Sequence, residues 1–414
     1  MPSKTIGLLV TSFIIGSAIT SSPVFAQQTA TSVTPAAAFL LWPNETKADP
    51  ETAGHQNLFT AVRTAKSWLQ RQVDNQLAAP SYRAPVVSSK NVPIEIIAAL
   101  WQAETNAFDY TRLLKSGSQL SPITNPHYSF KLIRDNGVNS VIEVSNRPDL
   151  QVLGLIHPVF ADISTAQRPR YRLDNVVYIP YSDQLNNDVI VRAGEEYLEK
   201  KIQAVYGELN TLGIHSWAQP DKLITEVINP AVVKSILAIE HVDISVLLNG
   251  SALSYLRKFY TTLALNEHAS YAYAKSAAAA RGLVQFIPST YASLRRLRPE
   301  LTLNADFVQG MTDPYNAIKA EIALLDYNLS LLPSAVRAKS EANPLDLGSY
   351  LAAMYNGGPA RVRQAIAKWG SDWHSYHGNV ASSLKLETAY YVAKFRLVYA
   401  HFTERSLHLA TTTL

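Results

Sequence analysis

One glutamate in this chain stands at the end of an apolar helix face. Val233, Ile236, Leu237 and Glu240 lie at positions i, i+3, i+4 and i+7, so they share one face of a helix. Burial penalises the charged form of a carboxylic acid, so the pKa of Glu240 should rise and the group should stay protonated near neutral pH. Such a group can act as a general acid. The alternative interpretation is a core glutamate paired with an arginine or lysine.

A glycine-containing block, ARGLVQFIPST (280–290), follows in the sequence. Gly282 lets the backbone pass close to another group, and Gln285 offers an amide that can both donate and accept hydrogen bonds. Pro288 is suited to the first turn of a helix. On its own the block also fits an ordinary helix start with a surface glutamine.

Two later blocks place aromatic and polar side chains on or beside helices. In AAMYNGGPARV (352–362) a helix ends at Tyr355, and the chain turns at Asn356 before a proline opens the next helix. In ETAYYV, Glu387 and Tyr391 are four positions apart, which puts them one turn apart on one helix face. A helix–turn–helix without chemistry is the alternative for the first of these blocks.

Together and in this order, ILAIEH (236–241) and these three blocks resemble the catalytic domain of the soluble lytic transglycosylases, which are lysozyme-like enzymes that cleave bacterial peptidoglycan. The resemblance covers about residues 225–400. It implies a small, mainly helical lysozyme-like domain with a saccharide cleft and with Glu240 as the catalytic residue. It also implies a set of substrate-binding residues: Gln285, Tyr355, Asn356, Glu387 and Tyr391.

The resemblance implies a reaction on peptidoglycan glycan strands. Glu240 would protonate the oxygen of the β-1,4 bond between N-acetylmuramic acid and N-acetylglucosamine, and would then act as the base that closes a 1,6-anhydro ring. This chemistry needs one carboxyl group, and we expect no metal and no cofactor. Two alternatives are a goose-type-lysozyme-like muramidase, in which water is the acceptor, and a non-catalytic wall-binding or scaffold protein.

The chain departs from the family pattern in two ways. His241 follows the acid where the family usually has serine, and it could tune the pKa of the acid or be a bystander. The segment between Glu240 and Gly282 is also longer than in the family, and it adds two acidic residues, Asp243 and Glu267, as candidates for a second carboxylate.

A second segment, IEIIAALWQAETNAFDY (94–110), also resembles the first block and offers Glu104 as a rival acid. No block with the pattern Gly-Leu-x-Gln or Tyr-Asn-x-Gly follows it within the length of a domain. The sequence therefore favours Glu240.

Composition sets the broad class. The chain has 414 residues, 47% hydrophobic and 17% charged, which is typical of folded protein and long for one domain of ~150 residues. A net charge of +4 gives no case for nucleic-acid binding, which calls for a basic patch. The absence of cysteine excludes disulfides, zinc–thiolate sites and a cysteine nucleophile.

Residues 1–26 have the layout of a secretory signal peptide. Lys4 is the one charged residue, an apolar stretch (6–19) follows, and Val24 and Ala26 are small residues where signal peptidase requires them. The stretch is shorter than the ~20 residues that span a bilayer, so we expect cleavage and no stable membrane span afterwards, with an uncleaved anchor as the alternative. The expected location is the periplasm, or else the cell exterior.

The element patterns predict an α+β protein with two parts. Residues 27–185 form a mixed α and β module, with helices at 58–77 and from 94 toward 114, and with strands at 128–135, 139–145, 152–163 and 175–180. Residues 186–414 form the mainly helical lysozyme-like domain. Three roles fit the first module: peptidoglycan binding, regulation of the cleft, and docking on a cell-envelope or secretion complex.

Overall fold

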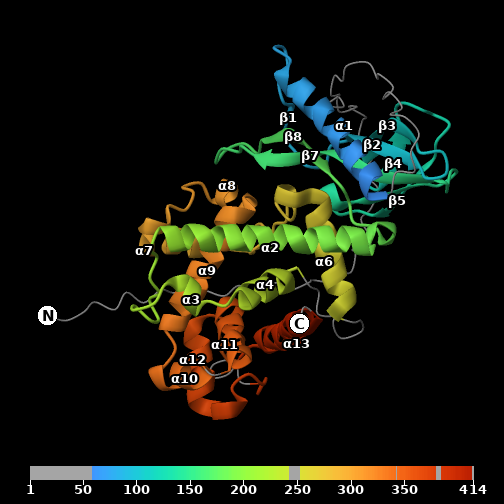
Figure 1. Cartoon of the computed structure of the whole chain (residues 1–414). Coiled ribbons are helices and arrows are strands. Elements are labelled where there is room, and N and C mark those ends of the chain that lie inside the picture. Colours follow the sequence, from blue (N-terminus) through green and yellow to red (C-terminus); the bar gives the residue numbers. More distant parts are fainter. Residues whose placement is uncertain (1–57, 242–251, 342, 379–383, 413–414) are drawn as a thin grey trace. The chain divides into compact units, whose positions relative to one another are not determined.

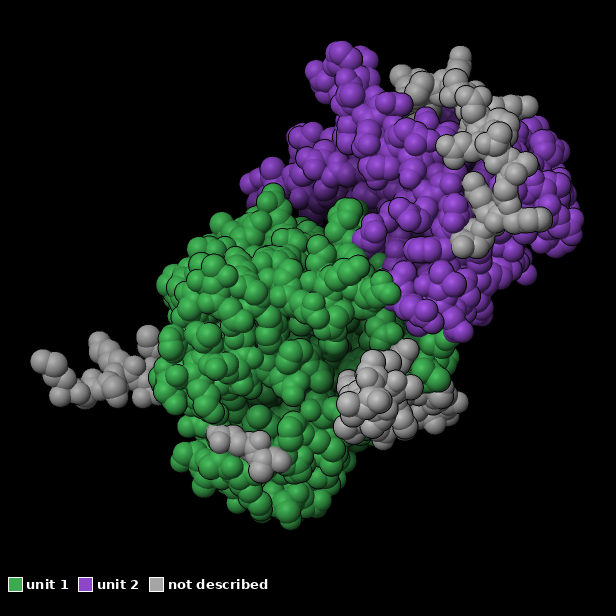
Figure 2. Space-filling view, in the orientation of Figure 1, with its two compact units in different colours: residues 1–18, 195–263, 268–414 green, residues 19–194, 264–267 purple. Residues whose placement is uncertain are grey.

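The computed structural model describes residues 58–241, 252–341, 343–378 and 384–412. These residues form two compact units (Figure 2). The strand-rich unit takes the described residues up to Gly194 together with Ala264–Glu267. The helical unit takes Glu195–Leu263 and the described residues from His268 onward. The predicted signal peptide lies outside the described residues.

The strand-rich unit contains helix α1 (Leu58–Ala78) and an antiparallel sheet (Figure 1). In its described residues the sheet has six strands in the order β1-β8-β7-β2-β3-β4, and β5 and β6 form a separate pair. The strands are β1 (Val86–Val87), β2 (Ile94–Gln102), β3 (Ala107–Ser116), β4 (Gln119–Pro122), β5 (Phe130–Arg134), β6 (Val141–Val144), β7 (Leu150–Asp162) and β8 (Tyr171–Tyr178). The predicted first helix and the four predicted strands are confirmed.

The predicted helix from residue 94 toward residue 114 is wrong, because this segment forms the antiparallel strands β2 and β3. Strand β2 lies between β3 and β7, and both of its faces are buried. Ile97, Ala99 and Trp101 pack in the hydrophobic core that also holds α1, whereas Ile96 and Ala98 pack in a second core on the opposite face. A strand buried on both faces has a continuous apolar sequence, which hides its period of two.

The helical unit is built around α9 (Pro314–Ser330), which packs against α3, α4, α7, α8 and α11. Asp313 caps this helix by accepting a hydrogen bond from the amide of Tyr315 at 3.0 Å, and Pro314 is its first residue. Helix α13 packs against both α4 and α11 (Figure 1). The two helices α9 and α13 therefore fix the position of α4.

The remaining helices follow the predicted pattern of a mainly helical second part. They are α2 (Asp188–Thr211), α3 (Ile224–Val227), α4 (Pro230–Ile239), α6 (Ala252–Asn266), α7 (Pro288–Leu297), α8 (Phe307–Thr312), α10 (Ser334–Glu341), α11 (Pro344–Gly357), α12 (Pro359–Trp369) and α13 (Leu386–Thr412). The α+β fold class is confirmed. Within the described ranges, none of the helices combines the length and the apolar character needed to span a membrane.

Candidate active site

Glu240 is the residue that ends helix α4. The helix begins at Pro230, where the side chain of Asn229 caps it, and the amide of Glu240 still bonds to the carbonyl of Ile236 at 3.1 Å. The predicted apolar face is fully buried and consists of Val233, Ile236 and Leu237. The C-terminal end of a helix carries partial negative charge, so this position disfavours an ionised carboxylate.

The side chain of Tyr391 contacts Glu240 directly. Its hydroxyl, on helix α13, donates a hydrogen bond to Oε1 of Glu240 at 2.5 Å. Burial raises the pKa of Glu240 to about 7; the hydrogen bond from Tyr391 and the charge of Lys394 oppose this rise, and the charge of Glu387 adds to it. A pKa near 7 allows the carboxyl group to give up and take back a proton near neutral pH.

The loop with Gln285 has an unusual backbone conformation. Gly282 has a φ of +72°, and a Cβ atom there would lie 1.9 Å from the carbonyl oxygen of Met311, so no other residue fits. Gln285 has a φ of +49°, and its Nε2 donates to the carbonyl of Gly282 at 2.8 Å. The hydroxyl of Tyr355 donates to the carbonyl of Val284, in the same loop, at 2.6 Å. Two of the predicted site residues therefore lie on or against one loop.

His241 also contacts this loop. Its Nε2 lies 2.9 Å from the carbonyl oxygen of Leu283, and its ring stacks on Tyr271 with centroids 3.8 Å apart. Burial lowers the pKa of His241 to about 4, so the imidazole is neutral near pH 7. Among the described residues, no hydrogen bond joins His241 to Glu240.

Asn356 is held by a residue that the sequence analysis did not single out. The hydroxyl of Thr388, which is buried on α13, donates to Oδ1 of Asn356 at 2.8 Å. Helices α11 and α13 come close at this point, since a Cβ atom on Gly357 would lie 2.8 Å from the side chain of Thr388. Because Oδ1 accepts this bond, the orientation of the Asn356 amide is set by Thr388.

A second buried carboxyl group, Glu321, was also missed. It lies in the middle of α9, is fully buried, and has no hydrogen-bond partner for either oxygen among the described residues. Burial raises its pKa well above the ordinary value, and the charge of Glu240 raises it further. Glu321 in turn raises the pKa of Tyr355 and of Tyr391, so it lies within electrostatic range of the predicted site. Its signal in the sequence is an acid inside an otherwise apolar run, AEIALL.

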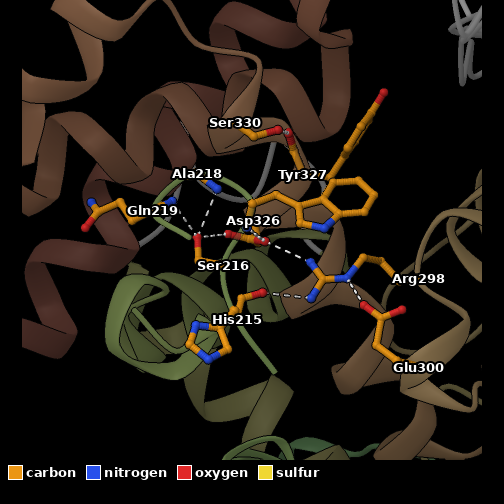
Figure 3. Close-up of polar contacts among 10 residues, drawn as sticks. His215, Ser216, Ala218, Gln219, Arg298, Glu300, Asp326, Tyr327 and Ser330 are labelled. Atoms are coloured by element: carbon orange, nitrogen blue, oxygen red, sulfur yellow. Dashed lines mark hydrogen bonds and ion pairs between the residues drawn. The ribbon is translucent and has the colours of Figure 1, made fainter. Parts of the chain in front are cut away.

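Another polar cluster in the helical unit has the residue types of a serine hydrolase triad but not the geometry (Figure 3). The hydroxyl of Ser216 donates directly to the carboxylate of Asp326, and Nδ1 of His215 faces the carbonyl oxygen of Pro220 at 2.9 Å. Buried Arg298 donates to Asp326 at 3.0 Å and to the carbonyl of His215 at 3.0 Å. With no bond between histidine and serine, the cluster anchors the chain before α3 to helix α9.

The rival acids do not share the environment of Glu240. Glu104 is exposed in the turn between β2 and β3. Glu267 pairs with Lys66 at 3.2 Å within the strand-rich unit. Asp243 lies outside the described residues. Over the described ranges, no three His, Asp or Glu side chains gather closely enough to hold a metal ion.

Comparison with known proteins identifies one family. No curated protein and no solved structure is significantly similar to this chain. Residues 252–375 match the family model described as Transglycosylase SLT domain. Gln285, Tyr355 and Asn356 lie inside the matched segment, whereas Glu240 and Tyr391 lie outside it. The helical part of this chain thus contains a transglycosylase SLT domain at residues 252–375.

Proposed function

We propose that this protein is a lytic transglycosylase that cleaves the β-1,4 bond between N-acetylmuramic acid and N-acetylglucosamine in peptidoglycan. The SLT domain is consistent with this activity. The observation that carries the proposal is the environment of Glu240: a buried helix end, a hydroxyl donor at 2.5 Å and a pKa of about 7. Each of these features suits one carboxyl group that acts first as an acid and then as a base.

In the first step, Glu240 protonates the glycosidic oxygen. Because Oε1 accepts the hydrogen bond from Tyr391, the acidic proton resides on Oε2, which is the oxygen that faces the leaving group in our proposal. The bond between C1 of the muramic acid and this oxygen breaks, and the N-acetylglucosamine chain leaves with the proton. The carboxylate that forms on Glu240 is stabilised by the hydroxyl of Tyr391.

In the second step, the Glu240 carboxylate removes the proton from the C6 hydroxyl of the muramic acid. The C6 oxygen then bonds to C1 and closes the 1,6-anhydro ring. No water is consumed, and Glu240 regains its proton, so the residue is ready for another cycle without a second carboxylate to hold water.

Mass spectrometry of the muropeptides released from purified sacculi tests this function. The protein lacking residues 1–26 should release anhydromuropeptides, and Glu240→Gln should release none while it remains folded. Products with reducing ends would make the enzyme a muramidase of the goose-type-lysozyme kind. Binding of sacculi without release by the wild type would indicate a non-catalytic wall-binding protein.

We also propose that the protein acts outside the cytoplasm, in the periplasm. The support is the sequence pattern of residues 1–26, together with a substrate that lies in the cell envelope. Intact-mass measurement of the protein purified from a cell-envelope fraction would show cleavage after Ala26. A full-length mass in the cytoplasmic fraction would contradict this location.

A further inference from the structure

We propose that His241 is a positioning residue, which clamps the loop of residues 281–286 and so holds Gln285 in place beside the reacting sugar. This proposal rests on the proposed function for its catalytic consequence. It assigns His241 a role different from tuning the charge of Glu240.

The loop adopts a conformation that does not persist without restraint. Within it, Gln285 has a φ of 49°, in the left-handed region that side chains disfavour. Backbone strain of this kind is retained where surrounding contacts fix the backbone. The loop also passes so close to Met311 that Gly282 has no room for a side chain.

Two side chains from different parts of the helical unit restrain consecutive carbonyl groups of this loop. His241, just after α4, bonds to the carbonyl of Leu283 at 2.9 Å, and Tyr355, on α11, donates to the carbonyl of Val284 at 2.6 Å. Leu283 and Val284 are both buried, so a lost partner would leave a buried carbonyl unpaired, which destabilises the loop. Gln285 is the next residue, so these two bonds restrain the backbone directly before it.

The contacts of the imidazole fix its tautomer and its orientation. A carbonyl oxygen can only accept, so Nε2 of His241 carries the proton and Nδ1 does not. The ring stacks on Tyr271, and Tyr271 stacks in turn on Phe259 with centroids 5.8 Å apart. With its pKa lowered to about 4 by burial, His241 keeps one neutral form across the pH range in which Glu240 titrates. A neutral donor suits a clamp, whereas a charged group would suit electrostatic tuning of Glu240.

A serine at this position could not replace the histidine. Its hydroxyl is one bond from Cβ, whereas Nε2 is on the far side of the imidazole ring, so serine would leave the Leu283 carbonyl unpaired. Restoring the residue that the related enzymes usually carry should therefore impair this enzyme. This expectation is specific to the present loop and separates a clamp from a bystander.

Three variants separate the functions of the ring. His241→Phe keeps the stacking on Tyr271 and loses the donor, His241→Gln keeps an amide donor of comparable reach and loses the ring, and His241→Ser loses both. We expect kcat/KM on peptide-free glycan strands to fall about tenfold or more in the Phe and Ser variants, mainly through KM. The Gln variant should stay within about threefold of the wild type, and the pH profile should keep its midpoint in all three.

Hydrogen exchange of the loop amides gives a readout that does not depend on activity. The amides of Arg281 and Gln285 bond within the loop, to Phe286 and Gly282, and should exchange faster in His241→Phe than in the wild type or in His241→Gln. Unchanged exchange in His241→Phe, or equal impairment of the Gln and Phe variants, would overturn the clamp. A displaced pH profile would assign a charge role instead. If the wild type released no fragments from sacculi, the proposed function would fail. Hydrogen exchange of the loop amides would still show whether His241 restrains the loop.

Discussion

The hydroxyl of Tyr391 lies 2.5 Å from Oε1 of Glu240, although 151 positions separate the two residues in the chain. The contact joins the end of α4 to the first turns of α13, two helices that pack against each other. It opposes the effect of burial on the pKa of Glu240, because a donor to the carboxylate stabilises the charged form. The balance of burial and this hydrogen bond leaves the carboxyl group with a pKa of about 7.

Removal of this donor should change both the rate and its pH dependence. In Tyr391→Phe the pKa of Glu240 should rise above about 7, because the group that favours its charged form is lost. The alkaline limb of kcat/KM, where the acid loses its proton, should therefore move to higher pH. The maximal rate should fall about ten- to hundredfold, since the carboxylate formed in the first step loses its donor. A pH profile of anhydromuropeptide release measures both effects.

Tyr390→Phe is the matched control, because Tyr390 is the adjacent tyrosine of α13 and is exposed. This variant should keep the wild-type rate and the wild-type midpoint of the alkaline limb of the pH profile. A midpoint that moved to lower pH in Tyr391→Phe, or stayed in place, would contradict the role given to the hydrogen bond.

The apolar periodicity of α4 is a local property, so the sequence could predict that Glu240 follows a buried helix face. The choice of Glu240 as the acid came from the order of the four sequence blocks and stays a prediction. The sequence was insufficient for Thr388 and Glu321, because their importance depends on which helices pack together. Thr388 donates a hydrogen bond to Asn356 on α11, and Glu321 lies within electrostatic range of Glu240 at the end of α4. Neither interaction can be read from the spacing of residues in the chain. The wrong helix predicted from residue 94 toward residue 114 begins in β2, and a strand buried on both faces has the same apolar composition as a buried helix.

Glu321 should make the protein less stable as pH rises. Its folded-state pKa is raised well above the ordinary value, so it contributes stability in acid that is lost as the pH rises beyond the pKa of the unfolded chain. Glu321→Gln is neutral at every pH and should remove this loss. Denaturant unfolding at about pH 4 and about pH 8 measures the free energy of unfolding. Between these two pH values it should decline less for Glu321→Gln than for the wild type.

Glu196→Gln serves as the control for this comparison, since Glu196 is exposed on α2 in the same unit. The free energy of unfolding of Glu196→Gln should decline with pH as that of the wild type does. An equal decline in Glu321→Gln would mean that Glu321 ionises as easily in the folded protein as in the unfolded chain.

Substitution by alanine should lower the stability of the protein at Gly282 and raise it at Gly207. A methyl group at Gly282 would lie 1.9 Å from the Met311 carbonyl at a φ of +72°, so Gly282→Ala should destabilise the protein by about 2 kcal/mol or more. Gly207 lies inside α2 with no atom within 4 Å of the added methyl, so Gly207→Ala should stabilise it by about 0.5–1 kcal/mol. Chemical denaturation of both variants measures this pair. Equal effects would refute the close approach at Met311.

Thr388 should influence catalysis through the orientation of Asn356. Its hydroxyl fixes Oδ1 of Asn356, so Thr388→Val, which keeps the shape but not the donor, allows the amide to turn over. We expect kcat/KM to fall about tenfold, whereas Thr388→Ser keeps the hydroxyl and should lose far less. The decisive measurement adds Thr388→Val to Asn356→Ala. If Thr388 acts through Asn356, the double variant should be no worse than Asn356→Ala alone, because the interaction has already been removed. Additive losses would show instead that Thr388 supports the packing of α11 on α13, where Gly357 approaches it.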